Sequence, residues 1–122
     1  MILADTSVWL QHLRGGEPLL ARRLDAGEVL GHPLVIGELA MGNLRQREIV
    51  LASLRALPQA VVASDDEVLG FVEREALHGL GVGYADAHLL ASARLSPETA
   101  LWTRDRRLAE LAVRMGIAAA DR

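Results

Sequence analysis

The sequence predicts a three-layer α/β/α domain in which a central, mainly parallel sheet is covered by helices on both faces. Short apolar segments typical of buried strands alternate with longer segments whose apolar residues recur at helical spacing. The strand-like segments are apolar throughout, which indicates that both faces of the sheet are covered. A chain of 122 residues has room for one such unit, so we expect residues 1–122 to form a single domain.

The first half of the chain is predicted to begin with a strand and to continue mainly as helices. Residues 5–7 (Asp-Thr-Ser) follow the apolar first segment and are types that favour a helix N-cap. In the helix that follows, we expect Val8, Trp9 and Leu13 to face inward, and Pro33 suits the first turn of a later helix. The expected strands are 1–4 and 28–31, and the expected helices are 6–13, 17–26, 33–44 and 47–57.

The second half alternates the same two kinds of segment. The sequence AVVA at 60–63 predicts a strand, and Ser64 or Asp65 can cap the helix expected at 66–80. The residues of that helix that recur at helical spacing are Val68, Leu69, Val72, Ala76 and Leu80. The remaining expected elements are helices at 86–95 and 105–115 and strands at 99–102 and 116–119.

Composition excludes several classes of function. The chain has no cysteine, so it has no disulfide, thiolate metal site or thiol nucleophile. It also has no lysine, because all 13 basic residues are arginine, and this excludes Schiff-base chemistry. No run of about 20 apolar residues indicates a membrane span, and the N-terminus lacks the pattern of a signal peptide. We therefore expect a cytoplasmic protein.

Four acidic residues stand at unusual places in the sequence. Asp5 and Asp105 follow predicted strands, and ligands of doubly wound sheets bind outside the carboxyl ends of the strands. Glu38 and Asp86 interrupt apolar helical segments, where an ionised carboxylate needs a partner. Each acid alone has a structural alternative: Asp5, Asp86 and Asp105 could cap helices, and Glu38 could share a polar stripe with Arg45.

Taken together, the four acids predict a site for a divalent cation. Oxygen ligands without cysteine or a close histidine pair favour Mg²⁺ or Mn²⁺, and such a site suits phosphodiester hydrolysis. The hydroxyls of Ser7 and Thr103 lie near these acids in the sequence and could support them. We expect the four histidines to be structural or surface residues, because His12, His32, His78 and His88 share no metal-ligand spacing.

Arginines near the acids are candidate phosphate contacts. The four acids account for more than the whole net charge of −3, so a bound cation would stop them from opposing an anionic substrate. The candidates are Arg14, Arg104, Arg106 and Arg107. Asp65 and Asp121 are acids that we expect to lie outside the site.

The sequence resembles the VapC toxins of bacterial toxin–antitoxin pairs, which are PIN-domain ribonucleases. The segments that carry the resemblance occur in order along the chain: MILADTSVWLQHLR, HPLVIGELAMGNLR, GLGVGYADAHLLASA and LWTRDRRLAELA. The resemblance implies a PIN-like fold with an acidic metal site at Asp5, Glu38, Asp86 and Asp105. Some relatives carry a further acid or asparagine after the last of these, where this chain has Arg106 and Arg107.

The resemblance also implies partners. It implies an RNA substrate that is cut endonucleolytically, typically transfer RNA or ribosomal RNA, and a VapB-like antitoxin that wraps the toxin. It implies a homodimer, for which we expect contacts in residues 28–57. Alternatives from the sequence are a housekeeping PIN nuclease without an antitoxin and a catalytically silent binding module. A phosphoacceptor receiver domain lacks its lysine here, and a haloacid-dehalogenase-like phosphatase would need an acid at Ser7.

Overall fold

The helices and strands of the computed structural model, which describes residues 1–119, follow the predicted alternation. Asp121 lies outside the described residues. The elements are β1 (Ile2–Ala4), α1 (Thr6–Gly15), α2 (Pro18–Asp25), β2 (Val29–Leu30), α3 (Pro33–Ala40), α4 (Arg47–Ala56), α5 (Asp65–Glu75), α6 (Tyr84–Leu95), β3 (Ala100–Trp102) and α7 (Arg106–Arg114).

The sheet is parallel, with strand order β2-β1-β3. Ile2 of β1 pairs with Val29 on one side and with Ala100 on the other. Single parallel bridges at Gln59 and Ala118 add one more chain segment beyond each outer strand. The first strand in the chain is therefore central, and the order of connections reverses between β1 and β3. A reversal of this kind creates the crevice in which doubly wound sheets bind ligands.

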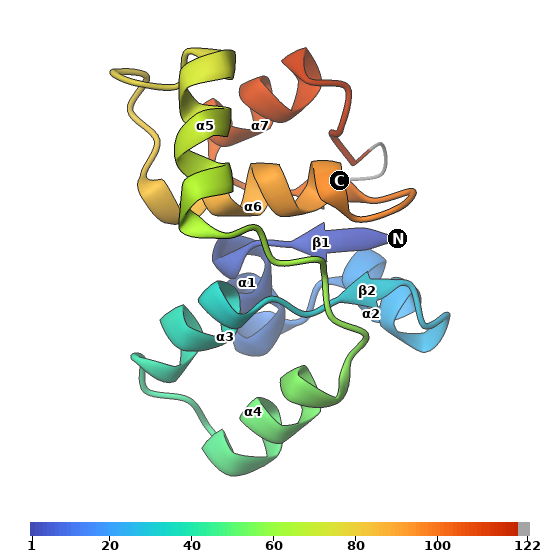
Figure 1. Ribbon diagram of the computed structural model, residues 1–122. Coiled ribbons are helices and arrows are strands. Elements are labelled where there is room, and N and C mark those ends of the chain that lie inside the picture. Colours follow the sequence, from blue (N-terminus) through green and yellow to red (C-terminus); the bar gives the residue numbers. More distant parts are fainter. Residues whose placement is uncertain (120–122) are drawn as a thin grey trace.

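Helices cover both faces of the sheet (Figure 1). In this view, α1 to α4 lie on one side of the sheet, and α5, α6 and α7 lie on the other. The α6 helix is the most enclosed, because every residue from Ala87 to Ala93 is buried. This arrangement confirms the predicted three-layer architecture with a parallel central sheet. No helix among residues 1–119 has the length and apolar character needed to cross a membrane.

Several predicted boundaries are wrong, for local reasons. Residues 60–63 form no strand, because the chain leaves the sheet after the Ala60 N–H donates to the Gly31 carbonyl, and the Val61 N–H bonds to the Ser96 hydroxyl instead. The helix predicted to reach residue 80 ends at Glu75, where Ala76 adopts a left-handed conformation. The helix predicted to reach residue 44 ends at Ala40, and the predicted last strand is reduced to the bridge at Ala118.

The predicted inward positions are correct in part. Val8 and Trp9 are buried, but Leu13 is 37% exposed. In α5, Val68 is buried, whereas Leu69 and Leu80 are exposed. Phe71 is the other buried residue of α5, and Leu77, which follows the early end of the helix, is buried as well.

Candidate functional site

Asp5 and Asp105 lie at the carboxyl ends of β1 and β3, beside the switch point of the sheet. Asp5 directly follows β1, and its backbone N–H donates to the carbonyl of Trp102 at 3.0 Å. Each aspartate is also the N-cap of the next helix: Asp5 accepts from the Val8 N–H at 3.2 Å, and Asp105 accepts from the Leu108 N–H at 2.9 Å. Both aspartates are therefore helix N-caps, which is the structural alternative that the sequence left open. As N-caps after β1 and β3, they place their carboxylates at the same edge of the sheet.

Two hydroxyl groups hold the Asp5 carboxylate. The Ser7 hydroxyl donates to Oδ1 at 2.5 Å, and the Thr103 hydroxyl donates to Oδ2 at 2.5 Å. These hydroxyls also accept backbone N–H groups from the β3–α7 loop, Ser7 from Arg104 and Thr103 from Asp105, each at 3.0 Å. Asp5 is only 6% exposed. Its orientation is fixed by Ser7 of α1 and by Thr103 of the β3–α7 loop. Ser7 and Thr103 thus lie where the sequence predicted supporting hydroxyls.

Glu38 reaches this edge from α3. The Thr6 hydroxyl donates to its Oε1 at 2.5 Å, which brings the α3 carboxylate to the first residue of α1. The premise that Glu38 is buried in an apolar helix is wrong, because the side chain is exposed. Val35 and Leu39 carry the apolar face of α3, and Glu38 lies outside that face. From the sequence, Thr6 was predicted only as an N-cap type. Its hydroxyl, next to Asp5 in the sequence, was the one feature that could have suggested its contact with a second acid of the site.

Asp86 belongs to the first turn of α6. Its Oδ2 accepts the Gly83 backbone N–H at 3.1 Å. Burial raises the pKa of Asp86, the Gly83 hydrogen bond opposes that shift, and the negative charges of Asp5, Asp105 and Glu38 raise the pKa further. The three other carboxylates therefore lie close enough to Asp86 to repel it, although they come from separate parts of the chain: the N-caps of α1 and α7, and α3.

The chemistry of these side chains fits a divalent cation. All four offer carboxylate oxygens, which suit Mg²⁺ and Mn²⁺, and a cation would relieve the repulsion that acts on Asp86. Within residues 1–119, no group of three His, Asp or Glu side chains is arranged to hold a metal ion. The carboxylates instead accept hydrogen bonds from Ser7, Thr103, Thr6 and backbone N–H groups.

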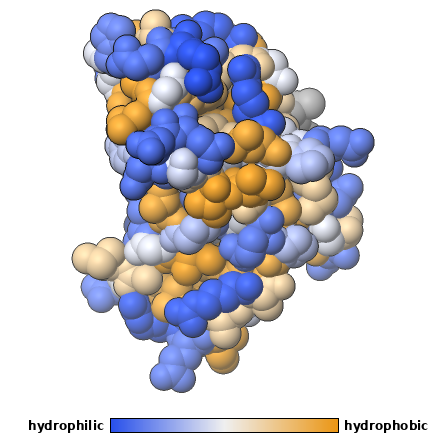
Figure 2. Space-filling view, viewed as in Figure 1, coloured by the Kyte–Doolittle hydropathy of each residue, from blue (hydrophilic) through white to orange (hydrophobic). Residues whose placement is uncertain are grey.

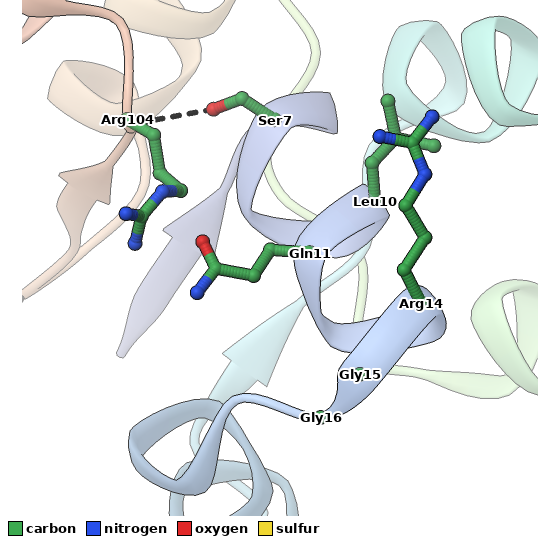
Figure 3. A pocket seen from close by; sticks show the side chains of 7 residues that line it. All are labelled: Ser7, Leu10, Gln11, Arg14, Gly15, Gly16 and Arg104. Carbon is green, nitrogen blue, oxygen red and sulfur yellow. Dashed lines mark hydrogen bonds between the residues drawn. The ribbon is translucent and has the colours of Figure 1, made fainter.

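Two grooves flank α1 next to these acids. One, of about 710 Å³, is lined by Ser7, Leu10, Gln11, Arg14, Gly15, Gly16 and Arg104. Figure 3 shows Gln11 and Arg104 extending toward the same space, whereas Arg14 turns to the other side of α1. A second groove, of about 700 Å³, contains Glu38, Arg14 and Arg45. Arg14 therefore borders both grooves, and each groove offers arginine beside the acidic cluster. Nothing in the sequence pattern pointed to Gln11.

The remaining predicted arginines differ in their surroundings. Arg106 forms an exposed ion pair with Glu110 one turn along α7, at 3.5 Å. The Arg107 guanidinium lies against Gly81 in the loop before α6. Arg104 and Arg14 line the groove in Figure 3. Among the four arginines predicted to contact phosphate, Arg14 and Arg104 are therefore the two that line a groove next to the acidic residues.

The histidines take structural positions, as predicted for them. His32 is fully buried, and its Nε2 lies 2.9 Å from the Ser92 hydroxyl. His88 is also buried, with Nε2 at 3.2 Å from Asp65. Asp65 also accepts the Tyr84 hydroxyl at 2.8 Å, and these two contacts lower the pKa of Asp65. Asp65 therefore supports the start of α6.

Comparison with known proteins agrees with this arrangement. The PIN domain family matches residues 2–114, which include all four acids. Two proteins of Mycobacterium tuberculosis, from strains CDC 1551 / Oshkosh and ATCC 25618 / H37Rv, are both named Ribonuclease VapC32. Each is 47% identical to this chain over 121 residues, which cover 99% of this chain and 98% of the relative.

Proposed function

The chain belongs to the PIN-domain family, among its VapC-type ribonucleases, and on this premise we propose that it is a divalent-metal-dependent endoribonuclease and the toxin of a VapBC-type pair. One observation supports the metal dependence above all. Asp5 and Asp105, at the carboxyl ends of β1 and β3, and Glu38 of α3 lie near enough to Asp86 of α6 for their negative charges to raise its pKa. Repulsion of this kind in the absence of a cation is expected of a site that binds one.

Each side chain has a distinct part in the proposed reaction. Asp5, Glu38, Asp86 and Asp105 would hold Mg²⁺ or Mn²⁺, which when bound lowers the pKa of a water molecule and stabilises charge on the phosphate. Ser7 and Thr103 fix the rotamer of Asp5, and Thr6 fixes that of Glu38. Arg14 and Arg104 would bind RNA phosphates in the groove along α1.

The metal dependence can be tested with purified protein and RNA. We expect cleavage of total RNA with Mg²⁺ or Mn²⁺ and none with chelator. Asp5→Asn and Asp86→Asn should lower the rate by at least about 100-fold, because a neutral ligand binds the cation less well. Asp25→Asn is the matched control: it removes one aspartate charge at the end of α2, ahead of β2 and so at the opposite edge of the sheet. Equal cleavage with chelator would overturn the proposed mechanism.

We propose that the partners are a VapB-like antitoxin and a second copy of the chain, and that the protein acts in the cytoplasm on transfer or ribosomal RNA. Exposed apolar residues support protein partners. Met41 is 89% and Ile49 is 63% exposed, both within residues 28–57, and Figure 2 shows an apolar band across the middle of one face.

We expect a dimer mass by sedimentation at micromolar concentration. We also expect that induction of the protein arrests growth and that co-expression of the antitoxin relieves this arrest. A monomer mass would refute the dimer.

A further inference from the structure

A buried hydrogen bond joins the two helices that carry Glu38 and Asp86. His32 precedes α3, and its Nε2 lies 2.9 Å from the Oγ of Ser92 in α6. Both residues are fully buried. The other ring nitrogen of His32, Nδ1, accepts the Leu34 N–H at 3.1 Å and so caps α3. One side chain therefore fixes the start of α3 and ties it to the middle of α6.

The two contacts of His32 define its protonation. Because Nδ1 accepts a backbone N–H, the ring proton lies on Nε2, which donates to Ser92. Burial, and to a smaller extent the neighbouring His88, lowers the pKa of His32 to about 4, so the ring is neutral near pH 7. A neutral ring with both nitrogens engaged has a single orientation, and a ring of this kind makes a rigid link.

The link is separated from each of the two acids by the same number of residues along the chain. Glu38 follows His32 by six residues along α3, and Asp86 precedes Ser92 by six residues along α6. Six residues of helix span about 9 Å, so a tilt of about 10° at the link would move either carboxylate by about 1.5 Å. An error of that size is large for a metal site, in which ligand distances vary by only about 0.2 Å.

We propose that His32 and Ser92 are positioning residues, which set the separation of Glu38 and Asp86 and thereby the affinity of the acidic site for a divalent cation. This inference rests on the proposed function. His32 and Ser92 lie in the core and act only through the helices they join. The ligand concerned is the cation itself, so binding can be measured without RNA.

Three variants separate the link from simple loss of packing. Ser92→Ala removes the link and keeps the cap of α3. His32→Asn keeps a favoured N-cap type but is too short to reach Ser92. Ser96→Ala is the matched control: Ser96 is also buried, caps the C-terminus of the same helix, and accepts one partly buried hydrogen bond, from the Val61 N–H in the segment after α4, at 2.9 Å.

The experiment is titration of Mn²⁺ followed by electron paramagnetic resonance at 20 °C, with folding checked by circular dichroism. We expect Kd for Mn²⁺ to rise about five- to tenfold in Ser92→Ala and His32→Asn, with no further rise in the double variant. Ser96→Ala should stay within twofold of wild type. In RNA cleavage, the two link variants should lower kcat and leave KM unchanged.

The outcomes distinguish this inference from the proposed function. Binding by Ser92→Ala as tight as wild type, or an equal loss in Ser96→Ala, would overturn the positioning role and leave the metal-dependent function standing. Absence of Mn²⁺ binding by the wild-type protein would overturn both.

Discussion

Asp5 shows why the function of a single residue could be predicted only in part from the sequence. Its place after an apolar strand suits a helix cap and a metal ligand equally well, and it does cap α1. Its carboxylate also accepts two hydroxyl groups. Ser7 is two residues away in the sequence, whereas Thr103 is 98 residues away and is brought to Asp5 by the fold. The acids at strand ends and the hydroxyls near them could be predicted from the sequence, whereas the pairing of the Thr103 hydroxyl with Asp5 required the fold.

Glu38 differs from Asp5, because it was predicted as a site residue on the incorrect assumption that its side chain is buried. Its apolar neighbours suggested a buried carboxylate, yet Val35 and Leu39 take the inward face and Glu38 is exposed. Its partner Thr6 lies 32 residues away. Helical periodicity predicts which residues are buried only when the direction of the apolar face is known, and that direction depends on tertiary packing.

His32 allows a prediction about pH. Its pKa is 6.5 in the unfolded chain and about 4 in the folded protein, so between these values the unfolded state binds more protons. Stability from this residue is complete above pH 6.5 and is lost as the pH falls toward 4, by about 3 kcal/mol in total. The physical reason is that the fold buries the ring away from water beside His88, which disfavours its charged form.

We expect urea unfolding to show this loss in the wild type between pH 7 and pH 4.5. His32→Asn has no titrating group at this position, so its free energy of unfolding should fall by about 2 kcal/mol less over the same range. If the two proteins lose stability in parallel, His32 is not held neutral by the fold.

At the scale of elements, the order of helices and strands followed from the sequence, and their ends did not. The strands of the sheet are only two or three residues long, so periodicity carries little information about them. The AVVA segment has strand-forming composition, but its Val61 N–H donates to the Ser96 hydroxyl in place of sheet pairing. In α5, the left-handed Ala76 ends the helix, and no residue preference announces that ending.

The loop before α6 offers a test at this scale. Gly79 and Gly81 both have positive φ, but an added Cβ at Gly79 meets open space, whereas at Gly81 it collides with the Arg107 guanidinium. We expect Gly79→Ala and Gly81→Ala to lower stability by similar amounts, about 1 kcal/mol, because a guanidinium moves easily. Arg107 is also a predicted phosphate contact, outside the two grooves, so only Gly81→Ala, which displaces it, should raise KM for RNA.

Urea unfolding and cleavage kinetics on both variants provide the measurement. Equal KM values for the two variants would show that the position of Arg107 does not matter to RNA binding. A much larger loss of stability in Gly81→Ala would show instead that the contact with Arg107 is structural.

At the scale of the whole molecule, the fold serves to gather like charges. The sheet order places the ends of β1 and β3 side by side, and helices from both layers bring Glu38 and Asp86 to the same edge. The sequence alone supported a doubly wound sheet with acids at one edge, because strand ends are readable from apolar segments. It could not give the distances between the acids, which depend on helix packing.

We propose above all that the four carboxylates form a cation site whose acids repel one another when no cation is bound. Asp86→Asn should therefore raise the stability of the metal-free protein, by less than about 1 kcal/mol because solvent screens part of the repulsion. Its amide oxygen can still accept the Gly83 N–H, so the start of α6 is preserved.

Thermal melting with and without Mg²⁺ tests this claim most directly. At about ten times its Kd, a ligand of the folded state adds about 1.4 kcal/mol, which is about 5 °C for a domain of this size. We expect Mg²⁺ to raise the Tm of wild type and of Asp25→Asn by this amount, and that of Asp86→Asn, which starts higher, by much less. A wild-type Tm that Mg²⁺ does not change, or an equal rise in all three proteins, would contradict the account.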